Sequence, residues 1–269
     1  MLNKTADAYS FLWNKSVEPV EKWHFNAMQE VVKEPIIRGQ MGIEIGSGCG
    51  YDTYIMAKAN PGVHIVSIDL SDGIYETQKR VSSLANVSLV KCSALSVPMK
   101  DGIFDFAYSF GVLHHTSDPK AGLREIARML KKNSPVFLYL YEDHSENPVK
   151  YVSIKMIRGL RLMTVRLPRG VLYFLACLMS PVVFVTFTLP ARIMMKFKST
   201  RRMAENMPFN FGRGPFSLRG DLYDRFGAPI EYRFSRDGVL EMLRDCGFSK
   251  ERITRLRNTA GWVAWGYKV

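Results

Sequence analysis

The chain has 269 residues, of which 47% are hydrophobic, so it can bury a sizeable core, and disorder is excluded as its default state. Its four cysteines form no closely spaced pair, which argues against a disulfide framework and a structural zinc site, predicts no metal, and suits a reducing cytoplasm. The first residues, MLNKTADAYSFLWN, contain no long apolar run, and we therefore expect no signal peptide.

The net charge of +12 comes from one segment. Between residues 150 and 219 there are thirteen lysines and arginines and a single acid, Glu205, while the rest of the chain carries 24 basic and 24 acidic residues. We therefore expect an anionic surface or ligand to face this segment.

Strand and helix signals alternate from residue 42 to residue 142. Apolar strands are predicted at 42–46, 64–71, 87–93, 104–115 (the last running into a loop) and 134–142, with helices through about residue 60, at 72–85 and at 118–132. Asp118 and Pro119 are typical of an N-cap and a first helical position. Repeated βα units with apolar strands predict a parallel sheet with helices on both faces.

The alternation resumes after about eighty residues. A helix is predicted at 235–248, and two strands at 251–258 and 261–269 are expected to form an antiparallel hairpin, with only Thr259 and Ala260 between them.

The stretch IEIGSGCG (43–50) holds three glycines spaced two apart. No lysine and Ser/Thr follow at the spacing of a phosphate loop, and the last glycine of a GxGxxG dinucleotide motif would fall at Tyr51. Asp69 ends the second predicted strand, 19 residues after Gly50, where an acid can accept hydrogen bonds from both hydroxyls of a ribose. The pattern favours a nucleoside ligand without a phosphate.

In order along the chain, IEIGSGCG, SIDLS and LSVPMKDGIFDFAYSFGVLHHTSDP resemble the successive motifs of class I S-adenosylmethionine-dependent methyltransferases, in the methyltransferase type 11 group that includes ubiquinone and menaquinone methyltransferases. The resemblance covers about two-thirds of the chain, including FLWN near its start. It implies an α/β, Rossmann-like, doubly wound seven-stranded sheet with an antiparallel last strand and a helical insertion after the fifth strand. The implied parts are an N-terminal helical cap (1–40), a core (41–148 and 230–269) and the insertion (149–229).

The resemblance implies S-adenosylmethionine as cofactor and assigns its binding residues. Glu44 is expected at the methionine end, with the loop backbone beneath the ligand, and Asp69 with Leu70 around the ribose and adenine. Ser93, followed by Ala94, stands where the family usually has an acid for the adenine amino group. The full expected set is Glu44, Gly46, Ser47, Gly48, Gly50, Asp69, Leu70, Ser93, Ala94, Ser109, Phe110 and His114.

Methyl transfer needs mainly positioning, plus a general base when the acceptor must lose a proton. His114 is the first choice as base because a neutral imidazole can accept a proton near pH 7. His115 and Tyr141 are the further catalytic candidates. Asp224, Tyr223 and Arg213 are expected near the acceptor. No [ND]PP[YF] motif or Pro-Cys pair is present, and no nucleic acid partner is expected.

Two helices are predicted in the insertion. In the first, 149–167, apolar residues share one side and basic residues the other, which is typical of a helix on an anionic membrane surface. The second, 170–190, has no charge and Pro181 at its centre, where we expect a kink. A single crossing of the bilayer would put the fifth and sixth strands on opposite sides. Two readings remain: contact of 149–202 with an anionic membrane, or a lid whose apolar helices pack on the core.

The sequence therefore predicts methyl transfer from S-adenosylmethionine to a small or lipid-like acceptor. The expected location is the cytoplasm, peripherally on the inner face of the membrane. Two alternatives stay open: a soluble methyltransferase of an anionic metabolite such as a nucleotide sugar, and a non-catalytic scaffold that binds the cofactor.

Overall fold

The computed structural model describes residues 2–15, 24–209, 218–256 and 261–269. Its centre is a seven-stranded sheet in the order β3-β2-β1-β4-β5-β7-β6. The strands are β1 (Met41–Ile45), β2 (His64–Asp69), β3 (Val87–Lys91), β4 (Phe106–Phe110), β5 (Pro135–Tyr141), β6 (Phe248–Arg255) and β7 (Gly261–Lys268).

The predicted parallel sheet with an antiparallel last strand is confirmed. β1 pairs in parallel with β2 and β4, whereas β7 runs antiparallel between β5 and β6. Several predicted boundaries differ, and two of them concern strands of the sheet. Of the run 104–115, only Phe106–Phe110 forms a strand, and β6 begins at Phe248, before the predicted 251, because the preceding helix has already ended. The predicted turn at Thr259 and Ala260 lies outside the described residues.

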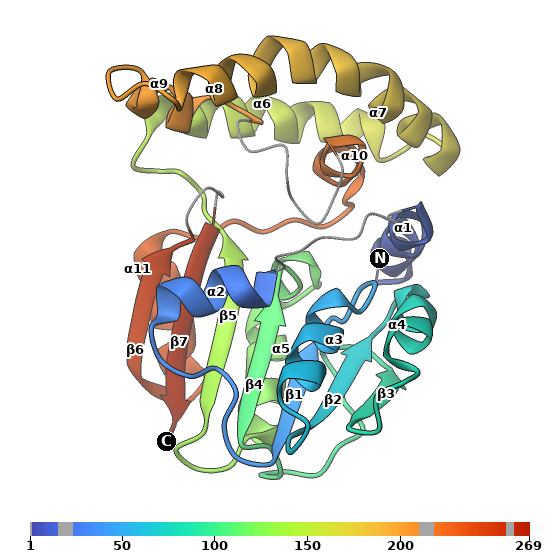
Figure 1. Cartoon of the computed structure of the whole chain (residues 1–269), viewed down its shortest axis with the longest axis vertical. Helices are drawn as coiled ribbons and strands as arrows, with labels where there is room; N and C mark the ends of the chain where they lie inside the picture. Colours follow the sequence, from blue (N-terminus) through green and yellow to red (C-terminus); the bar gives the residue numbers. More distant parts are fainter. Residues whose placement is uncertain (1, 16–23, 210–217, 257–260) are drawn as a thin grey trace.

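Helices cover both faces of the sheet (Figure 1). On one face lie α2 (His24–Val32) and α3 (Tyr51–Ala59), with α4 (Gly73–Val81) next to α3, and on the other lie α5 (Pro119–Met129) and α11 (Arg236–Asp245). The alternation of β5 explains this arrangement. Val136, Leu138 and Leu140 enter one core, and Phe137 and Tyr139 enter the other.

Capping residues mark the starts of two helices. The Asp118 side chain accepts a hydrogen bond of 2.8 Å from the Ala121 amide, and Pro119 takes the first helical position of α5. Asn147 caps the first insertion helix in the same way, through the Lys150 amide at 3.1 Å.

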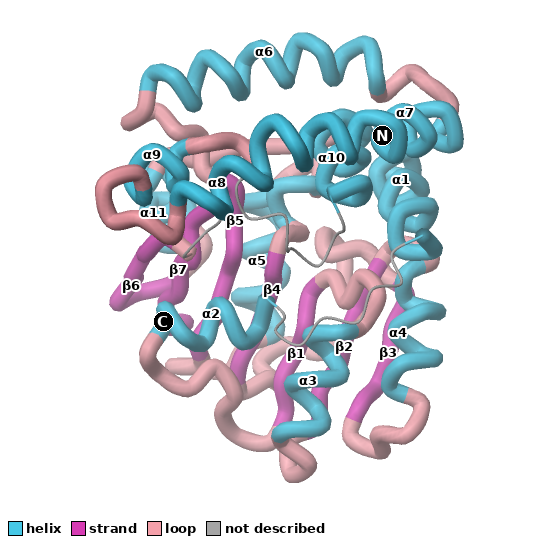
Figure 2. The backbone as a smooth tube through the Cα atoms, turned by 45° about the horizontal axis from the view of Figure 1, so that its top comes forward, coloured by secondary structure: helices cyan, strands magenta, loops and turns pink. Residues whose placement is uncertain are grey.

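The insertion lies beyond the carboxyl ends of the parallel strands, together with α1 (Leu2–Lys15) (Figures 1 and 2). Its helices are α6 (Pro148–Thr164), α7 (Arg169–Val183), the π-helix η2 (Phe184–Thr188), α8 (Leu189–Met194), α9 (Arg201–Asn206) and α10 (Leu218–Gly227). α7 continues through Pro181, and the helix widens into η2 three residues later. A proline removes one amide donor from the helical ladder, which is a common setting for such an irregularity.

An Arg–Glu–Arg group ties the insertion to the core. Glu231, with 5% of its side chain exposed, accepts from Arg161 of α6 at 2.7 Å and from Arg233 at 2.7 Å. Arg161 also donates to the Arg225 carbonyl at 2.9 Å. Arg161 is the one basic residue of the predicted polar side of α6 that is buried.

Replacing Glu231 with glutamine should lower the free energy of unfolding by about 3 kcal/mol, because two largely buried guanidinium groups lose their counter-charge. Urea unfolding measures the loss, and proteolysis should quicken within 149–229. Glu205→Gln, which breaks an exposed pair with Arg201, is the control and should cost under about 0.5 kcal/mol. Equal stability of the two variants would contradict the anchoring role.

Candidate functional site

A pocket lies beyond the carboxyl ends of β1, β2 and β4. Its lining comes from α1, the β1–α3 loop, the end of β2 and the segments after β3 and β4. This is the position where open α/β sheets bind ligands.

The β1–α3 loop forms the floor of the pocket. Gly46 and Gly48 have φ values of 85° and 55°, which side-chain-bearing residues rarely adopt. A Cβ atom on Gly48 would come within 2.7 Å of the Trp13 ring. The amides of Gly46 and Ser47 both donate to the Ile68 carbonyl, at 2.7 and 3.0 Å, which ties the loop to β2.

Asp69 organises the wall next to this loop. One carboxylate oxygen accepts from the Gly48 amide at 2.8 Å, and the other accepts from the amide and hydroxyl of Ser71 at 2.7 and 2.6 Å. Burial raises the pKa of Asp69, while these donors lower it. The acid predicted to hold a ribose therefore lies at the pocket and also fixes the glycine loop.

The structure brings most of the expected cofactor residues together. Those that line the pocket are Gly46, Ser47, Gly48, Asp69, Leu70, Ser93, Ala94 and Phe110, and His115 of the catalytic set joins them. Those outside its lining are Glu44, Gly50, Ser109, His114 and Tyr141. Gly50 precedes α3 with a left-handed φ of 80°, and Ser109 donates to the Ile45 carbonyl at 3.4 Å.

Glu44 is held beneath the pocket instead of in its wall. It is 2% exposed, and its Oε2 accepts from the hydroxyls of Thr53 and Ser67 at 2.5 Å each. Burial, together with nearby Asp52, raises the pKa of Glu44 to about 8. Asp52 lines the pocket and Glu44 does not, so a contact of Glu44 with the methionine end, directly or through water, stays a prediction.

His114 does not have the placement expected of a base. It is fully buried, both ring nitrogens have no hydrogen-bond partner, and burial, with His115 and Arg233 nearby, holds its pKa well below the usual 6.5. Its ring packs on Tyr141 with centroids 3.9 Å apart. His115 is better placed, since it lines the pocket and its Nδ1 lies 2.7 Å from the Ile230 carbonyl. That carbonyl can only accept, so Nδ1 carries the proton and Nε2 keeps its lone pair in the neutral form.

Sequence reasoning missed several lining residues. Tyr9 and Trp13 come from α1, one helical turn apart, and His24 begins α2. The His24 and Phe110 rings stack with their centroids 3.9 Å apart, and the His24 Nδ1 lies 3.1 Å from Asp52 Oδ2. The FLWN resemblance was the only signal for this cap, because contacts between segments so far apart leave no local pattern.

One acid of the insertion reaches the edge of the pocket. Asp224 of α10 accepts from the hydroxyls of Tyr9 at 2.6 Å and Tyr141 at 3.2 Å. It thereby joins the cap, the end of β5 and the insertion. Tyr223 donates to the Ala8 carbonyl at 3.4 Å, and Arg213 lies outside the described residues.

The strand order, the glycine loop and the pocket closed by α1 define the class I, S-adenosylmethionine-dependent methyltransferase architecture. A family described as "Methyltransferase domain" matches residues 43–138 of this chain. The family and the fold imply S-adenosylmethionine as the cofactor. The lining residues fit that cofactor because the loop offers backbone, a ribose acid and no phosphate-binding lysine.

Two curated relatives share the core. A tRNA (carboxymethyluridine(34)-5-O)-methyltransferase of Saccharomyces cerevisiae is 34% identical over 35% of this chain and 32% of its own length. A demethylmenaquinone methyltransferase of Clavibacter sepedonicus is 31% identical over 38% of this chain and 41% of its own. The chain thus spans about a third to two-fifths of these relatives.

Solved structures show the fold over the whole length. A SAM dependent methyltransferase from Aquifex aeolicus is 13% identical, with a TM-score of 0.56 over 97% of this chain and 98% of that one. At this identity the likeness concerns architecture alone.

The stability of the protein should depend on the proton held by Glu44. Between pH 4.5 and about 8 the folded protein keeps a proton that the unfolded chain releases, so the free energy of unfolding should fall as the pH rises, by about 1.4 kcal/mol per unit, and level off above pH 8. Glu44→Gln has no such titration. Urea unfolding at pH 5, 6.5 and 8 should show a smaller fall in the free energy of unfolding for Glu44→Gln than for the wild type. The same pH dependence in both proteins would contradict a proton held by Glu44.

Proposed function

We propose that this protein transfers a methyl group from S-adenosylmethionine to a lipid-like acceptor while its insertion rests on an anionic membrane surface. The observation that carries the proposal is the exposed apolar surface of the insertion. Of the twenty-three exposed large apolar side chains among the described residues, twenty lie between residues 151 and 203.

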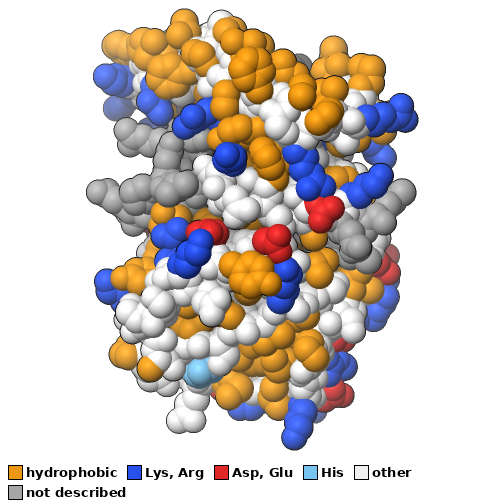
Figure 3. Space-filling model, turned by 90° about the vertical axis from the view of Figure 1, so that its right-hand side faces the viewer, with side chains coloured by type: hydrophobic (Ala, Val, Ile, Leu, Met, Phe, Trp, Pro, Cys, Tyr) orange, Lys and Arg blue, Asp and Glu red, His pale blue; other side chains and the backbone are white. Residues whose placement is uncertain are grey.

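This apolar surface covers the end of the molecule farthest from the sheet (Figures 1 and 3). Met156 on α6 is 67% exposed, Phe174 on α7 is 65% exposed, and Val185 on η2 is 61% exposed. The helix Arg169–Met194 is long and apolar enough, by length and composition, to cross a membrane, yet little of it is buried. An apolar patch of this extent typically marks a protein or membrane contact.

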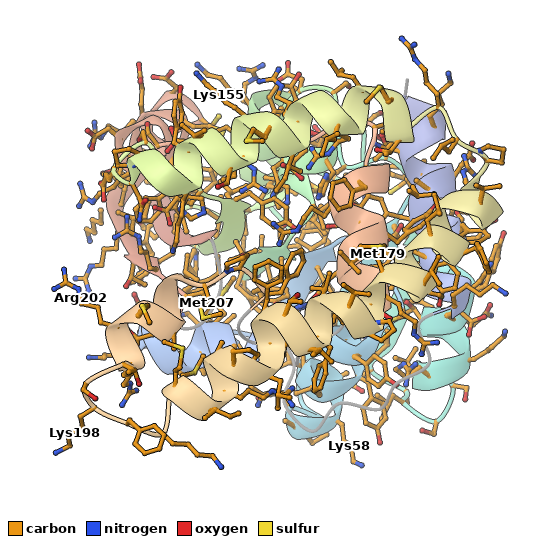
Figure 4. The ribbon with its side chains drawn as sticks, turned by 90° about the horizontal axis from the view of Figure 1, so that it is seen from above. Lys58, Lys155, Met179, Lys198, Arg202 and Met207 are labelled. Atoms are coloured by element: carbon orange, nitrogen blue, oxygen red, sulfur yellow. The ribbon has the colours of Figure 1, made fainter. Side chains whose placement is uncertain are left out.

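Basic side chains border the apolar surface. Looking down on this end, Figure 4 shows α6 running alongside α7 and α8, with Lys155 at one margin and Lys198 and Arg202 at the other. The exposed basic residues of the insertion include Lys155, Arg158, Arg166, Lys196, Lys198, Arg201 and Arg202. Apolar helices lying in a plane with lysines and arginines at their margins are suited to the interface of an anionic bilayer.

The geometry favours surface contact over the other readings. The apolar side of α6 faces away from the core, with Leu160 48% and Met163 63% exposed, so it does not pack as a closed lid. A single crossing conflicts with the sheet, because β5 and β6 flank the insertion in the chain and both belong to one sheet. Two helices lying on the bilayer satisfy both observations.

In this proposal, segments outside the family-matched residues 43–138 determine which acceptor is used. The two relatives match 35% and 38% of this chain, and their names specify a tRNA nucleoside in one case and demethylmenaquinone in the other. In this chain the segments beyond the core are α1 and the insertion, whose exposed side is apolar. This surface supports a lipid-like acceptor that reaches the pocket from the membrane.

S-adenosylmethionine supplies an electrophilic methyl group when bound. The glycine loop and Asp69 would hold the nucleoside, while α1, through Tyr9 and Trp13, excludes water from that side. His115 offers Nε2 to accept a proton from the acceptor, with its ring fixed by the Ile230 carbonyl.

Cofactor binding should depend on Asp69. In titration calorimetry, S-adenosylmethionine should bind at micromolar concentration, and Asp69→Ala should weaken binding at least tenfold by removing the ribose acceptor and the Gly48 bond. Asp72→Ala, an exposed acid at the start of α4, is the matched control. If wild type fails to bind at millimolar ligand with or without vesicles, the methyltransferase proposal is overturned.

Membrane binding should depend on the apolar surface. Sedimentation with phosphatidylglycerol-containing vesicles should show binding that weakens with salt, whereas phosphatidylcholine vesicles should bind less. Met156→Glu with Phe174→Glu should reduce binding at least tenfold, because two apolar side chains worth about 1.5–3 kcal/mol each no longer enter the interface. Tyr75→Glu, exposed on α4, is the control. Unchanged binding of the double variant, or binding of tRNA in preference to vesicles, would refute the membrane assignment.

A further inference from the structure

Arg225 on α10 is an arginine without a counter-ion. Its Nε is buried and has no hydrogen-bond partner, and within the described ranges no carboxylate forms a salt bridge with its guanidinium. The Arg225 Cζ atom lies 4.6 Å from the centroid of the Phe209 ring. A guanidinium withdrawn from water is normally paired with an anion.

Two of the three acids near Arg225 bind other partners. Glu231 is shared by Arg161 and Arg233, and Asp224 accepts from Tyr9 and Tyr141. Asp221, one turn earlier on α10, remains beyond salt-bridge distance. Burial raises the pKa of Asp221 to about 7, so near neutral pH it is only partly ionised. Burial, with Arg233 nearby, lowers the pKa of Arg225, while Asp221, Tyr141 and Glu231 act against this shift.

The position of Arg225 connects the pocket with the insertion. Its neighbour Asp224 contacts Tyr9, which lines the pocket, while its own backbone carbonyl accepts from Arg161 of α6. Phe209 continues the apolar side, with Phe187 of η2 at a centroid distance of 6.4 Å. Arg225 does not itself line the pocket; it lies one residue from the Asp224–Tyr9 contact that borders the pocket, and its guanidinium packs on Phe209 of the insertion.

We propose that Arg225 is the anion-binding group of the acceptor site, and that the acceptor is an amphiphile bearing a carboxylate or phosphate group next to an apolar body. The planar guanidinium matches both anions in two-point hydrogen bonding. The identification of the bound amphiphile as the methyl acceptor rests on the proposed function. The existence of an anion site at Arg225 does not.

The test is calorimetry on the full-length protein with S-adenosylmethionine present, using dodecyl phosphate, dodecanoate, dodecyl maltoside and inorganic phosphate as probes below their micelle concentrations. The two anionic amphiphiles should bind, and Arg225→Gln should weaken them at least tenfold while dodecyl maltoside is unaffected. Arg225→Lys should restore part of the affinity. Arg219→Gln, an exposed arginine on the same helix, is the matched control. Cofactor binding by each variant, measured alone, shows that it folds.

The probes separate the two sources of the anion. Tighter binding of dodecyl phosphate than of inorganic phosphate, both dependent on Arg225, supports an amphiphile. Equal binding supports the anion site but overturns the amphiphile. Anionic amphiphiles that bind equally to wild type and Arg225→Gln overturn the site. Arg225-dependent binding in a protein that fails to bind the cofactor would overturn the methyltransferase function and leave the anion site standing.

Discussion

The burial of both faces of one mostly parallel sheet is the constraint on which this molecule depends. With α2 and α3 on one face and α5 and α11 on the other, only the strand ends remain open. The carboxyl ends of β1, β2 and β4 therefore collect the glycine loop, Asp69 and the segment after Phe110. The cap and the insertion pack over the same end, so cofactor site and acceptor side share one boundary.

Charge is handled differently on the two sides of that boundary. Below it, Glu44 is buried with hydroxyl partners and keeps its proton at neutral pH, which avoids an unpaired charge in the core. Above it, Glu231 forms ion pairs with two arginines and Asp224 accepts hydrogen bonds from two tyrosines, whereas Arg225 has no ion-pair partner among the described residues. The insertion is thus anchored by buried ion pairs while its outer side exposes apolar groups between basic margins.

This layout separates the family-matched core from the cap and the insertion. Residues 43–138 match a methyltransferase family, and two relatives that match 35% and 38% of the chain are named for different acceptors. Under the proposed function, α1 and the insertion, which lie outside residues 43–138, would determine the acceptor. The apolar surface, the basic margins and Arg225 all belong to the insertion, and all three are suited to an anionic amphiphile or a membrane that holds one.

The sequence by itself determined the βα order, the antiparallel last strand, the glycine loop and Asp69, because periodicity, turns and helix caps act between residues close in the chain. Only the tertiary structure decided that His115 lines the pocket while His114 is buried, and that Tyr9 meets Asp224 across 215 positions. It also decided that α6 buries Arg161 and exposes its apolar side. A helical periodicity identifies two faces, but the neighbour against which each face packs is fixed by contacts that no local pattern encodes.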